Sequence, residues 1–298
     1  MTFTSQPRYR ALLLVPFLLL LAMAIAFAPT ASAQSKAPNR IVALTPFSAN
    51  TMAYLGVKPA AVGQTLGGDK RLAPVLRTSK VLKLSHPNGP NLEQLINQRA
   101  QLVFTSSQWR KGTQSMRNLG MRVVETEPRT IGQVYAQTRR IAEIINRKAR
   151  GNRFLSQMKR ETRQATAGIS KRPKVLLLLG VGQTPFTFLE NSWGGQIMKA
   201  AGGRMITGGA TSSGGFARIS DEEVLVANPD VIVAVPHANT RDIPKLIDFM
   251  KNNPAWESTP AARKDQIYVS TDNSMLQAGT DVARTIRVVR KQYLRNWK

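Results

Sequence analysis

Apolar and polar positions alternate with a helical period through the middle of the chain, from about Thr130 to Ser170. The spacing of three and four residues places the apolar or small side chains on one face of an amphipathic helix. These side chains are Ile131, Val134, Thr138, Ile141, Ile145, Leu155, Met158, Thr162, Ala165 and Ile169. Gly151 interrupts the pattern. Because glycine costs about 1 kcal/mol relative to alanine inside a helix, we expect Gly151 to divide this stretch into two helices.

The segments on either side of the helical stretch resemble each other. Residues 91–104 align without a gap on residues 220–233, and each segment reads as a polar N-cap, a short helix, a turn and a buried strand. Buried strands that alternate with helices are typical of parallel sheets. The sequence therefore predicts two related α/β lobes with mainly parallel sheets, joined by a long backbone helix, with a ligand cleft between the lobes.

The remaining pattern predicts the elements of each lobe. We expect strands at 40–45, 59–64, 101–106, 121–126, 174–179, 185–189, 230–235 and 266–270. We expect helices at 46–55, from 91, at 109–119, after 191, from 220, at 243–250, near 255 and at 277–296. Residues 65–90 and 202–215 are rich in glycine and read as long loops.

The N-terminus has the features of an export signal. Arg8 and Arg10 precede an apolar run at 11–28, and Ala31-Ser-Ala33 is a small-residue cleavage site. Pro16 and the cleavage site favour a removable signal over a membrane anchor. We therefore expect a signal peptide at 1–33, an N-terminal lobe at 34–149, a connecting backbone helix at 150–171 and a C-terminal lobe at 172–298. The chain has no cysteine, which excludes disulfides and a lipid-anchored N-terminal cysteine, so we expect a soluble protein in the periplasm.

The chain is strongly basic. Its formal net charge is +25, and removal of Arg8 and Arg10 with the signal leaves +23, since residues 1–33 contain no acid. Nucleic acid is the usual partner of such a chain. Export, scattered basic residues and the lack of a nucleic-acid-binding motif argue against it. An anionic ligand or an anionic membrane surface fits an exported protein better.

Several short motifs, in order along the chain, resemble one family. They are Arg-Ile-Val-Ala-Leu at 40–44, Tyr-Leu-Gly-Val at 54–57, Ala-Val-Gly at 61–63, Pro-Asn-Leu-Glu at 90–93, Leu-Gly-Met-Arg-Val-Val at 119–124, Asn-Pro-Asp-Val-Ile-Val at 228–233 and Pro-Ala-Trp at 254–256. Together they resemble the periplasmic binding proteins of iron-complex (siderophore or haem) and cobalamin ABC transporters, the class with a helix as interdomain backbone. The resemblance implies a monomer that binds a small-molecule chelate between its lobes and delivers it to an inner-membrane permease through a transient membrane-protein contact.

Two glutamates occupy equivalent positions in the aligned segments. Asn91 with Gln94, and Ser220 with Glu223, have the spacing of capping boxes, so Glu93 and Glu222 fall at the second helical position. Acids there complement the helix dipole, worth about 0.3–1 kcal/mol each. In the family, an acid at this point of each lobe pairs with arginines of the permease. Glu93 and Glu222 match those positions, and the resemblance implies permease docking by both.

Candidate ligand contacts lie in loops that follow strands, where α/β sheets bind ligands. They are Phe47, Gln64, His86, Trp109 and Arg110 in the first lobe, and Trp193, Phe216, Arg218, His237, Met275 and Leu276 in the second. Core packing is the alternative role for the two tryptophans, and solvation for the two arginines. Hydroxamate-binding relatives carry an arginine before the Asn-Leu-Glu segment and a tyrosine after the next strand. This chain has His86 or Pro87 and Trp109 or Arg110 there, which argues against a hydroxamate ligand.

The sequence lacks the motifs of common enzymes and metal sites. It contains no Gly-x-Ser-x-Gly, no His-Glu-x-x-His and no phosphate loop, so we expect no catalytic residues. Two histidines, one in each lobe, are too few for a bare-metal cage, so we expect no metal ligands and no cofactor. The leading ligand is an anionic Fe(III) chelate of the citrate, carboxylate or catecholate kind. Haem or cobalamin, with His86 or His237 as an axial ligand, is the alternative, and an exported envelope scaffold is the alternative of another class.

Overall fold

The computed structural model describes residues 1–2, 38–65, 72–180, 186–212, 214–236, 243–270 and 274–297. The expected signal peptide lies outside the described residues, apart from Met1 and Thr2. Residues 37–298 form one compact unit, separate from residues 1–36, and the description below concerns that unit. Within the described ranges, no helix has the length and apolar character needed to cross a membrane.

The first lobe is built on a five-stranded sheet in which every pair of strands is parallel. Its strand order is β3 (Lys80–Leu82), β2 (Ala61–Gly63), β1 (Ile41–Ala43), β6 (Leu102–Thr105) and β7 (Arg122–Glu125). Helices α2 (Pro46–Tyr54), α3 (Leu92–Asn97) and α4 (Arg110–Asn118) connect the strands, with 3₁₀ turns η2 (Pro74–Leu76) and η3 (Ser107–Trp109). The two-stranded sheet β4 (Leu84–Ser85) and β5 (Gly89–Pro90) completes the lobe.

The central strand β1 explains why this sheet is buried on both sides. Residues of β1 and the residue that follows it alternate between two apolar clusters, with Ile41 and Ala43 on one face and Val42 and Leu44 on the other. Successive side chains of a strand point to opposite faces, so a run of apolar residues is needed to cover both faces with helices. The long loop region expected at 65–90 contains three short strands, β3, β4 and β5, in its second half.

The second lobe repeats this plan with a mixed sheet. Strand β8 (Lys174–Gly180) pairs in parallel with β12 (Val231–Pro236) and β10 (Arg204–Met205), and β12 pairs in parallel with β13 (Ile267–Val269). Strands β9 (Phe186–Phe188) and β11 (Phe216–Arg218) add an antiparallel edge. The helices are α7 (Trp193–Ala200), α8 (Asp221–Ala227), α9 (Ile243–Lys251), α10 (Pro260–Arg263) and α11 (Val282–Tyr293), with a 3₁₀ turn η5 (Pro254–Trp256). The predicted fold class, two α/β lobes with mainly parallel sheets, is confirmed.

The connection between the lobes is a helical hairpin of α5 (Ile131–Ile144) and α6 (Lys148–Thr166). The predicted division of this stretch at Gly151 is wrong. The chain turns at Asn146, which takes a left-handed φ of 54°, while Gly151 lies buried inside α6. A Cβ at position 151 would overlap the Cβ of Ala142 on α5. Glycine is therefore used here for close approach of two helices.

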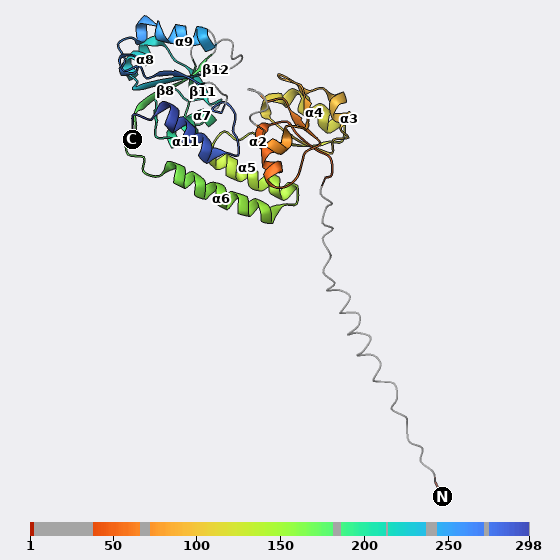
Figure 1. The fold of residues 1–298 in the computed structure, drawn as a ribbon. Helices are drawn as coiled ribbons and strands as arrows, with labels where there is room; N and C mark the ends of the chain where they lie inside the picture. The colour runs from red at the N-terminus through yellow and green to blue at the C-terminus, as the bar shows by residue number, and fades with distance from the viewer. Residues whose placement is uncertain are drawn as a thin grey trace. The chain divides into compact units, whose positions relative to one another are not determined.

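One apolar cluster runs through both lobes and the hairpin. It contains Ile41 and Phe104 of the first lobe, Ile141 and Met158 of the hairpin, and Leu177 of β8. Helix α6 packs against both α5 and α11, and Figure 1 shows these three helices side by side. The two lobes are therefore joined by continuous side-chain packing as well as by the chain.

Candidate ligand-binding site

A pocket of about 110 Å³ lies between the two lobes. Its first-lobe wall consists of Ser107, Gln108, Glu127, Pro128 and Arg129, and its second-lobe wall of Phe188, Ser192, Trp193, Gly214, Phe216, Leu276, Gln277 and Ala278. The first-lobe wall comes from the segments that directly follow β6 and β7. Both are carboxyl ends of parallel strands, the edge at which α/β sheets bind ligands.

The first-lobe wall is polar and centres on Glu127. The Ser106 hydroxyl donates a hydrogen bond to Oε2 of Glu127, and Nε2 of Gln108 donates to Oε1 over 3.3 Å. Burial raises the pKa of Glu127 above its ordinary value. The Ser106 hydrogen bond and the charge of Arg129 lower this pKa, and the charge of Glu125 adds to the rise. The wall thus holds a carboxyl group, an amide and a guanidinium within a short stretch of surface.

The second-lobe wall is mostly apolar and aromatic. Trp193 is buried, and its indole Nε1 donates a hydrogen bond to the carbonyl oxygen of Ser274 over 2.8 Å. Phe216 is half-buried and packs edge-on against Phe188, with ring centroids 4.8 Å apart. With Leu276 these rings give the flat apolar surface on which the organic part of a ligand can pack.

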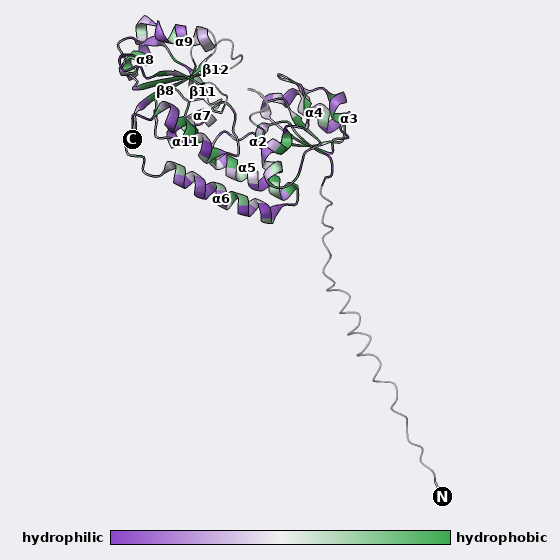
Figure 2. Ribbon diagram, viewed as in Figure 1, coloured by the Kyte–Doolittle hydropathy of each residue, from purple (hydrophilic) through white to green (hydrophobic). Residues whose placement is uncertain are grey.

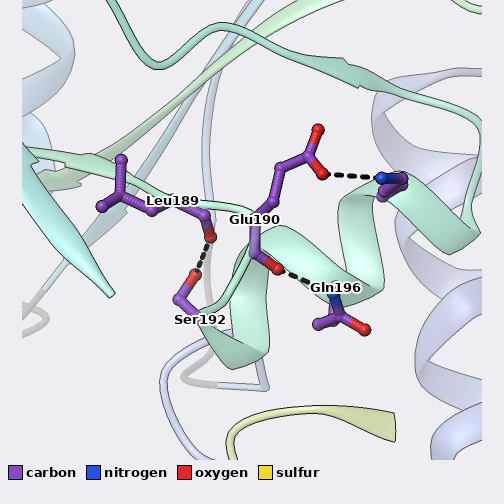
Figure 3. Close-up of polar contacts among 5 residues, drawn as sticks. Leu189, Glu190, Ser192 and Gln196 are labelled. Carbon is purple, nitrogen blue, oxygen red and sulfur yellow. Dashed lines mark hydrogen bonds and ion pairs between the residues drawn. The ribbon is translucent and has the colours of Figure 1, made fainter. Parts of the chain in front are cut away.

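Hydrogen bonds hold the turn that precedes Trp193 at the start of α7, and Figure 3 shows them around Ser192 and Glu190. Ser192 is the N-cap: it accepts a hydrogen bond from the backbone N–H of Gly195, and its hydroxyl donates to the carbonyl oxygen of Leu189 over 2.6 Å. Nε2 of Gln196 donates to the carbonyl oxygen of Glu190 over 2.7 Å, and the Glu190 carboxylate pairs with Lys199 at 2.6 Å. The turn is therefore tied to the first two turns of the helix that carries Trp193.

Three of the predicted ligand contacts line the pocket, namely Trp193, Phe216 and Leu276. Phe47 and Met275 are almost completely buried and belong to the apolar cluster shared by the lobes. Trp109 packs in the apolar cluster on the other face of the first sheet. It lies so close to Gly89 that a Cβ added to this glycine would be 3.1 Å from the Cβ of Trp109. In this conformation, core packing accounts for Phe47, Met275 and Trp109.

The other predicted contacts lie away from the pocket lining. Gln64, His86, Arg110 and Arg218 are exposed, and the guanidinium of Arg218 lies 5.8 Å from the ring centre of Phe186. His237 lies outside the described residues. The polar wall of Ser107, Gln108, Glu127 and Arg129 was missed by the sequence analysis. Its signal was available, since these residues directly follow two predicted strands.

The two glutamates expected at the permease contact are exposed at the second position of their helices, Glu93 on α3 and Glu222 on α8. The capping box at Ser220 forms: its hydroxyl accepts from the Glu223 N–H, and Oε2 of Glu223 accepts from the Ser220 N–H. The box predicted at Asn91 is wrong. Asn91 accepts from the N–H of Glu93 instead, and Oε1 of Gln94 is buried without a partner.

A family model described as periplasmic binding protein matches residues 41–273. The high-affinity heme uptake system protein IsdE of Staphylococcus aureus (strain MRSA252) is 23% identical over 228 residues, which is 71% of this chain and 77% of that protein.

Solved structures share the fold. An ABC transporter substrate-binding protein from Listeria monocytogenes EGD-e superimposes with a TM-score of 0.76 at 19% identity, over 88% of this chain and 100% of that one. The periplasmic vitamin B12 binding protein BtuF of Vibrio cholerae superimposes with a TM-score of 0.64 at 16% identity, over 87% of this chain and 98% of that one. The resemblance inferred from the sequence motifs is thereby confirmed. The chain belongs to the periplasmic binding protein family, whose members are substrate-binding proteins of transporters and not enzymes.

Proposed function

We propose that this protein captures a flat metal tetrapyrrole, haem in the first place, in the pocket between its lobes and delivers it to an inner-membrane ABC permease. The observation that carries the proposal is the contrast between the two pocket walls. Aromatic and aliphatic side chains form one wall, and Arg129, Gln108 and Glu127 form the other. Haem has the matching division, with an apolar macrocycle and two carboxylates on one edge.

Each wall has a distinct part in this proposal. Trp193, Phe216 and Leu276 pack against the macrocycle, where apolar burial and ring contacts supply most of the affinity. The Arg129 guanidinium offers planar donors to a carboxylate. The similarity to IsdE supports haem, and the similarity to BtuF supports the wider class of tetrapyrroles.

The size of the pocket adds a requirement. Sites for small organic ligands enclose roughly 300–1,000 Å³, whereas this pocket encloses about 110 Å³. A tetrapyrrole therefore needs side-chain movement at the mouth or must remain partly exposed. Phe216 is half-buried, which makes it the aromatic residue that can rotate with the least disruption of the core.

An anionic Fe(III) chelate is the second candidate. The net charge of +25 over the full sequence favours anions at long range. The described pocket lining gives this candidate less support, because it contains neither Arg110 nor Arg218.

A ligand panel tests the proposal. The protein without residues 1–33 is titrated with haem, cobalamin, ferric citrate and a ferric catecholate, following tryptophan fluorescence and, for haem, the absorbance of the porphyrin. We expect haem to bind and to quench fluorescence. The affinity for haem should fall in Trp193→Phe and stay near that of the wild type in the matched variant Trp297→Phe, because Trp297 packs against the shared apolar cluster outside the pocket lining. Tight binding of ferric citrate or catecholate without haem, weakening with salt, would establish the second candidate. If no compound binds, the protein fits the envelope scaffold instead.

We further propose that Glu93 and Glu222 contact the permease. Both are exposed, occupy equivalent places in the two lobes and lie outside the pocket lining. The double variant Glu93→Ala/Glu222→Ala should abolish uptake in cells and leave ligand affinity near that of the wild type. Glu143→Ala/Glu257→Ala removes two other exposed carboxylates and should support normal uptake. Full uptake by the first variant would refute the assignment.

A further inference from the structure

The outward side of helix α6 carries a concentration of exposed positive charge. Lys148, Arg153, Lys159, Arg160 and Arg163 are exposed along it, and we call these five side chains the α6 basic face. The single acid of the helix is Glu161, which is partly buried and accepts a hydrogen bond from Gln157. Figure 2 shows the hydrophilic colouring continuing along the length of α6.

Neighbouring segments extend the charge. Helix α11 packs against α6 and presents Arg284, Arg287 and Lys291 on its own exposed side, with no acid between Val282 and Tyr293. Lys171 and Arg172 are exposed in the segment that leaves α6 for the second lobe. The helical layer is thus basic beyond the single helix.

Of the five side chains in the α6 basic face, Lys159 has a contact within the fold, since its ammonium lies 5.6 Å from the ring centre of Tyr135 on α5. Core packing and ion pairing do not account for the other four. Helix α6 packs through Gly151, Leu155, Met158 and Ala165, which lie on its opposite side. The ion pairs found among the described residues join Lys199 to Glu190 and Lys251 to Asp265, and none involves α6. Like charges on neighbouring turns of a helix repel each other and destabilise it. These basic side chains therefore lower the stability of the isolated protein. An anionic partner outside the molecule removes this repulsion.

We propose that the α6 basic face binds the anionic phospholipid headgroups of a bilayer as a reversible peripheral contact. Helix α6 has 19 residues, which gives a straight edge of about 28 Å at 1.5 Å per residue. A bilayer of anionic lipids presents negative charge as a plane, and a long straight row of lysines and arginines can meet many headgroups at once. Members of the family work beside a membrane-embedded permease, so such a surface is within reach.

The apolar residues of the helix decide the kind of contact. None of the large exposed hydrophobic residues of the described chain lies on α6, and Phe154 is stacked on Tyr54 with ring centroids 4.8 Å apart. Without an apolar side chain to insert, binding depends on charge and is screened by salt. The face is also separate from the pocket lining and from Glu93 and Glu222, so lipid binding and ligand binding should be independent.

Vesicle flotation tests the proposal. The protein without residues 1–33 is mixed with phosphatidylcholine vesicles that do or do not contain phosphatidylglycerol. Wild type is compared with Arg153→Gln/Arg160→Gln/Arg163→Gln and with the charge-matched control Arg77→Gln/Arg117→Gln/Arg122→Gln, whose three arginines are exposed on the first lobe. We expect binding to the anionic vesicles alone. The α6 variant should lose about a hundred-fold in affinity, or about five-fold per arginine, and the control should change little.

Other outcomes overturn the proposal. Equal losses in the two variants would show that net charge acts without a defined face, and equal binding to vesicles without phosphatidylglycerol would exclude headgroup recognition. Binding to soluble inorganic polyphosphate without binding to anionic vesicles would assign the face to a polyanion and not to lipid. The control for folding is the melting temperature and the affinity for haem of each variant. If both equal the wild-type values, each variant is folded and the flotation assay compares the surfaces alone.

Discussion

At the scale of single residues, Glu127 has the most informative surroundings in the pocket. Its carboxyl group accepts hydrogen bonds from Ser106 and Gln108, and burial raises its pKa. A partly buried carboxylate that is held by two donors faces any bound ligand at a fixed place. If the pocket binds the proposed ligand, Glu127 should accept a hydrogen bond from it or repel its carboxylates, and should thereby influence which edge of the ligand lies beside Arg129.

The raised pKa of Glu127 has a consequence for stability. A raised pKa in the folded state means that the ionised Glu127 lowers the free energy of unfolding. This loss of stability is absent below the ordinary pKa of about 4.5 and appears as the pH rises through that value. We expect Glu127→Gln to melt at a higher temperature than the wild type at pH 7, and the difference to shrink towards pH 4. Thermal melting at the two pH values measures this. Glu143→Gln, which changes an exposed carboxylate on α5, is the control and should give no such gain. A lower melting temperature for Glu127→Gln at pH 7 would contradict the argument.

The two candidate tryptophans show how far the sequence could identify the site. Trp109 and Trp193 both stand at the start of a helix after a strand, and the sequence left each open between core and cleft. The structure turns Trp109 towards Gly89, through a 3₁₀ turn, and Trp193 towards the pocket. The two tryptophans differ in which face of a sheet they pack against. This depends on the tertiary structure and cannot be predicted from the local sequence.

At the scale of elements, long periodic segments were predictable and short ones were not. The periodic stretch at 130–170 forms two helices as expected, yet its break was misplaced because helix propensity disfavours Gly151 while tertiary packing requires it. Strand β3 has three residues, two of them exposed. Such a segment is too short to show a period of two, so its place beside β2 depends on the rest of the sheet.

Two glycines of the helical hairpin should respond in opposite ways to the same substitution. A Cβ at Gly151 would overlap Ala142, so Gly151→Ala should destabilise the protein by about 1–3 kcal/mol through overpacking. A Cβ at Gly132, in the first turn of α5, meets nothing closer than 3.9 Å. Gly132→Ala should therefore stabilise by up to about 1 kcal/mol, the helix-propensity difference. Denaturant unfolding measures both, and Ala142→Gly should relieve part of the defect of Gly151→Ala. A neutral Gly151→Ala would mean that the helices can separate at little cost.

At the scale of the whole molecule, the aligned segments at 91–104 and 220–233 predicted the two-lobe plan because each encodes the same unit. The units form α3 with β6 and α8 with β12, and Arg99 and Asn228 take left-handed φ values of 50° and 51° at matching positions. The basic charge was equally plain in the sequence, but its location was not. The arginines proposed for the cleft, Arg110 and Arg218, lie outside the pocket lining, while the helical connection carries a continuous basic face.

The connection between the lobes should limit their relative motion. The apolar cluster that runs from β1 through α5 and α6 to β8 would have to break for a wide hinge rotation, and α6 is also held by α11. Exposing such a contact costs roughly 25 cal/mol for each Å² of apolar surface. We therefore expect ligand binding to change the pocket mouth and to leave the arrangement of the lobes almost unchanged.

Solution scattering of the protein without residues 1–33, with and without a saturating ligand, measures the relative position of the lobes. The two curves should nearly superimpose, because the small pocket of about 110 Å³ can be enlarged by rotating Phe216 without moving the packed hairpin. Gly151→Ala is an informative comparison, since loosening the α5–α6 contact should broaden the distribution of lobe positions in the free protein and narrow it again with ligand. A closure of tens of degrees in the wild-type protein would show that the hairpin bends, and that the shared apolar cluster does not hold the lobes together.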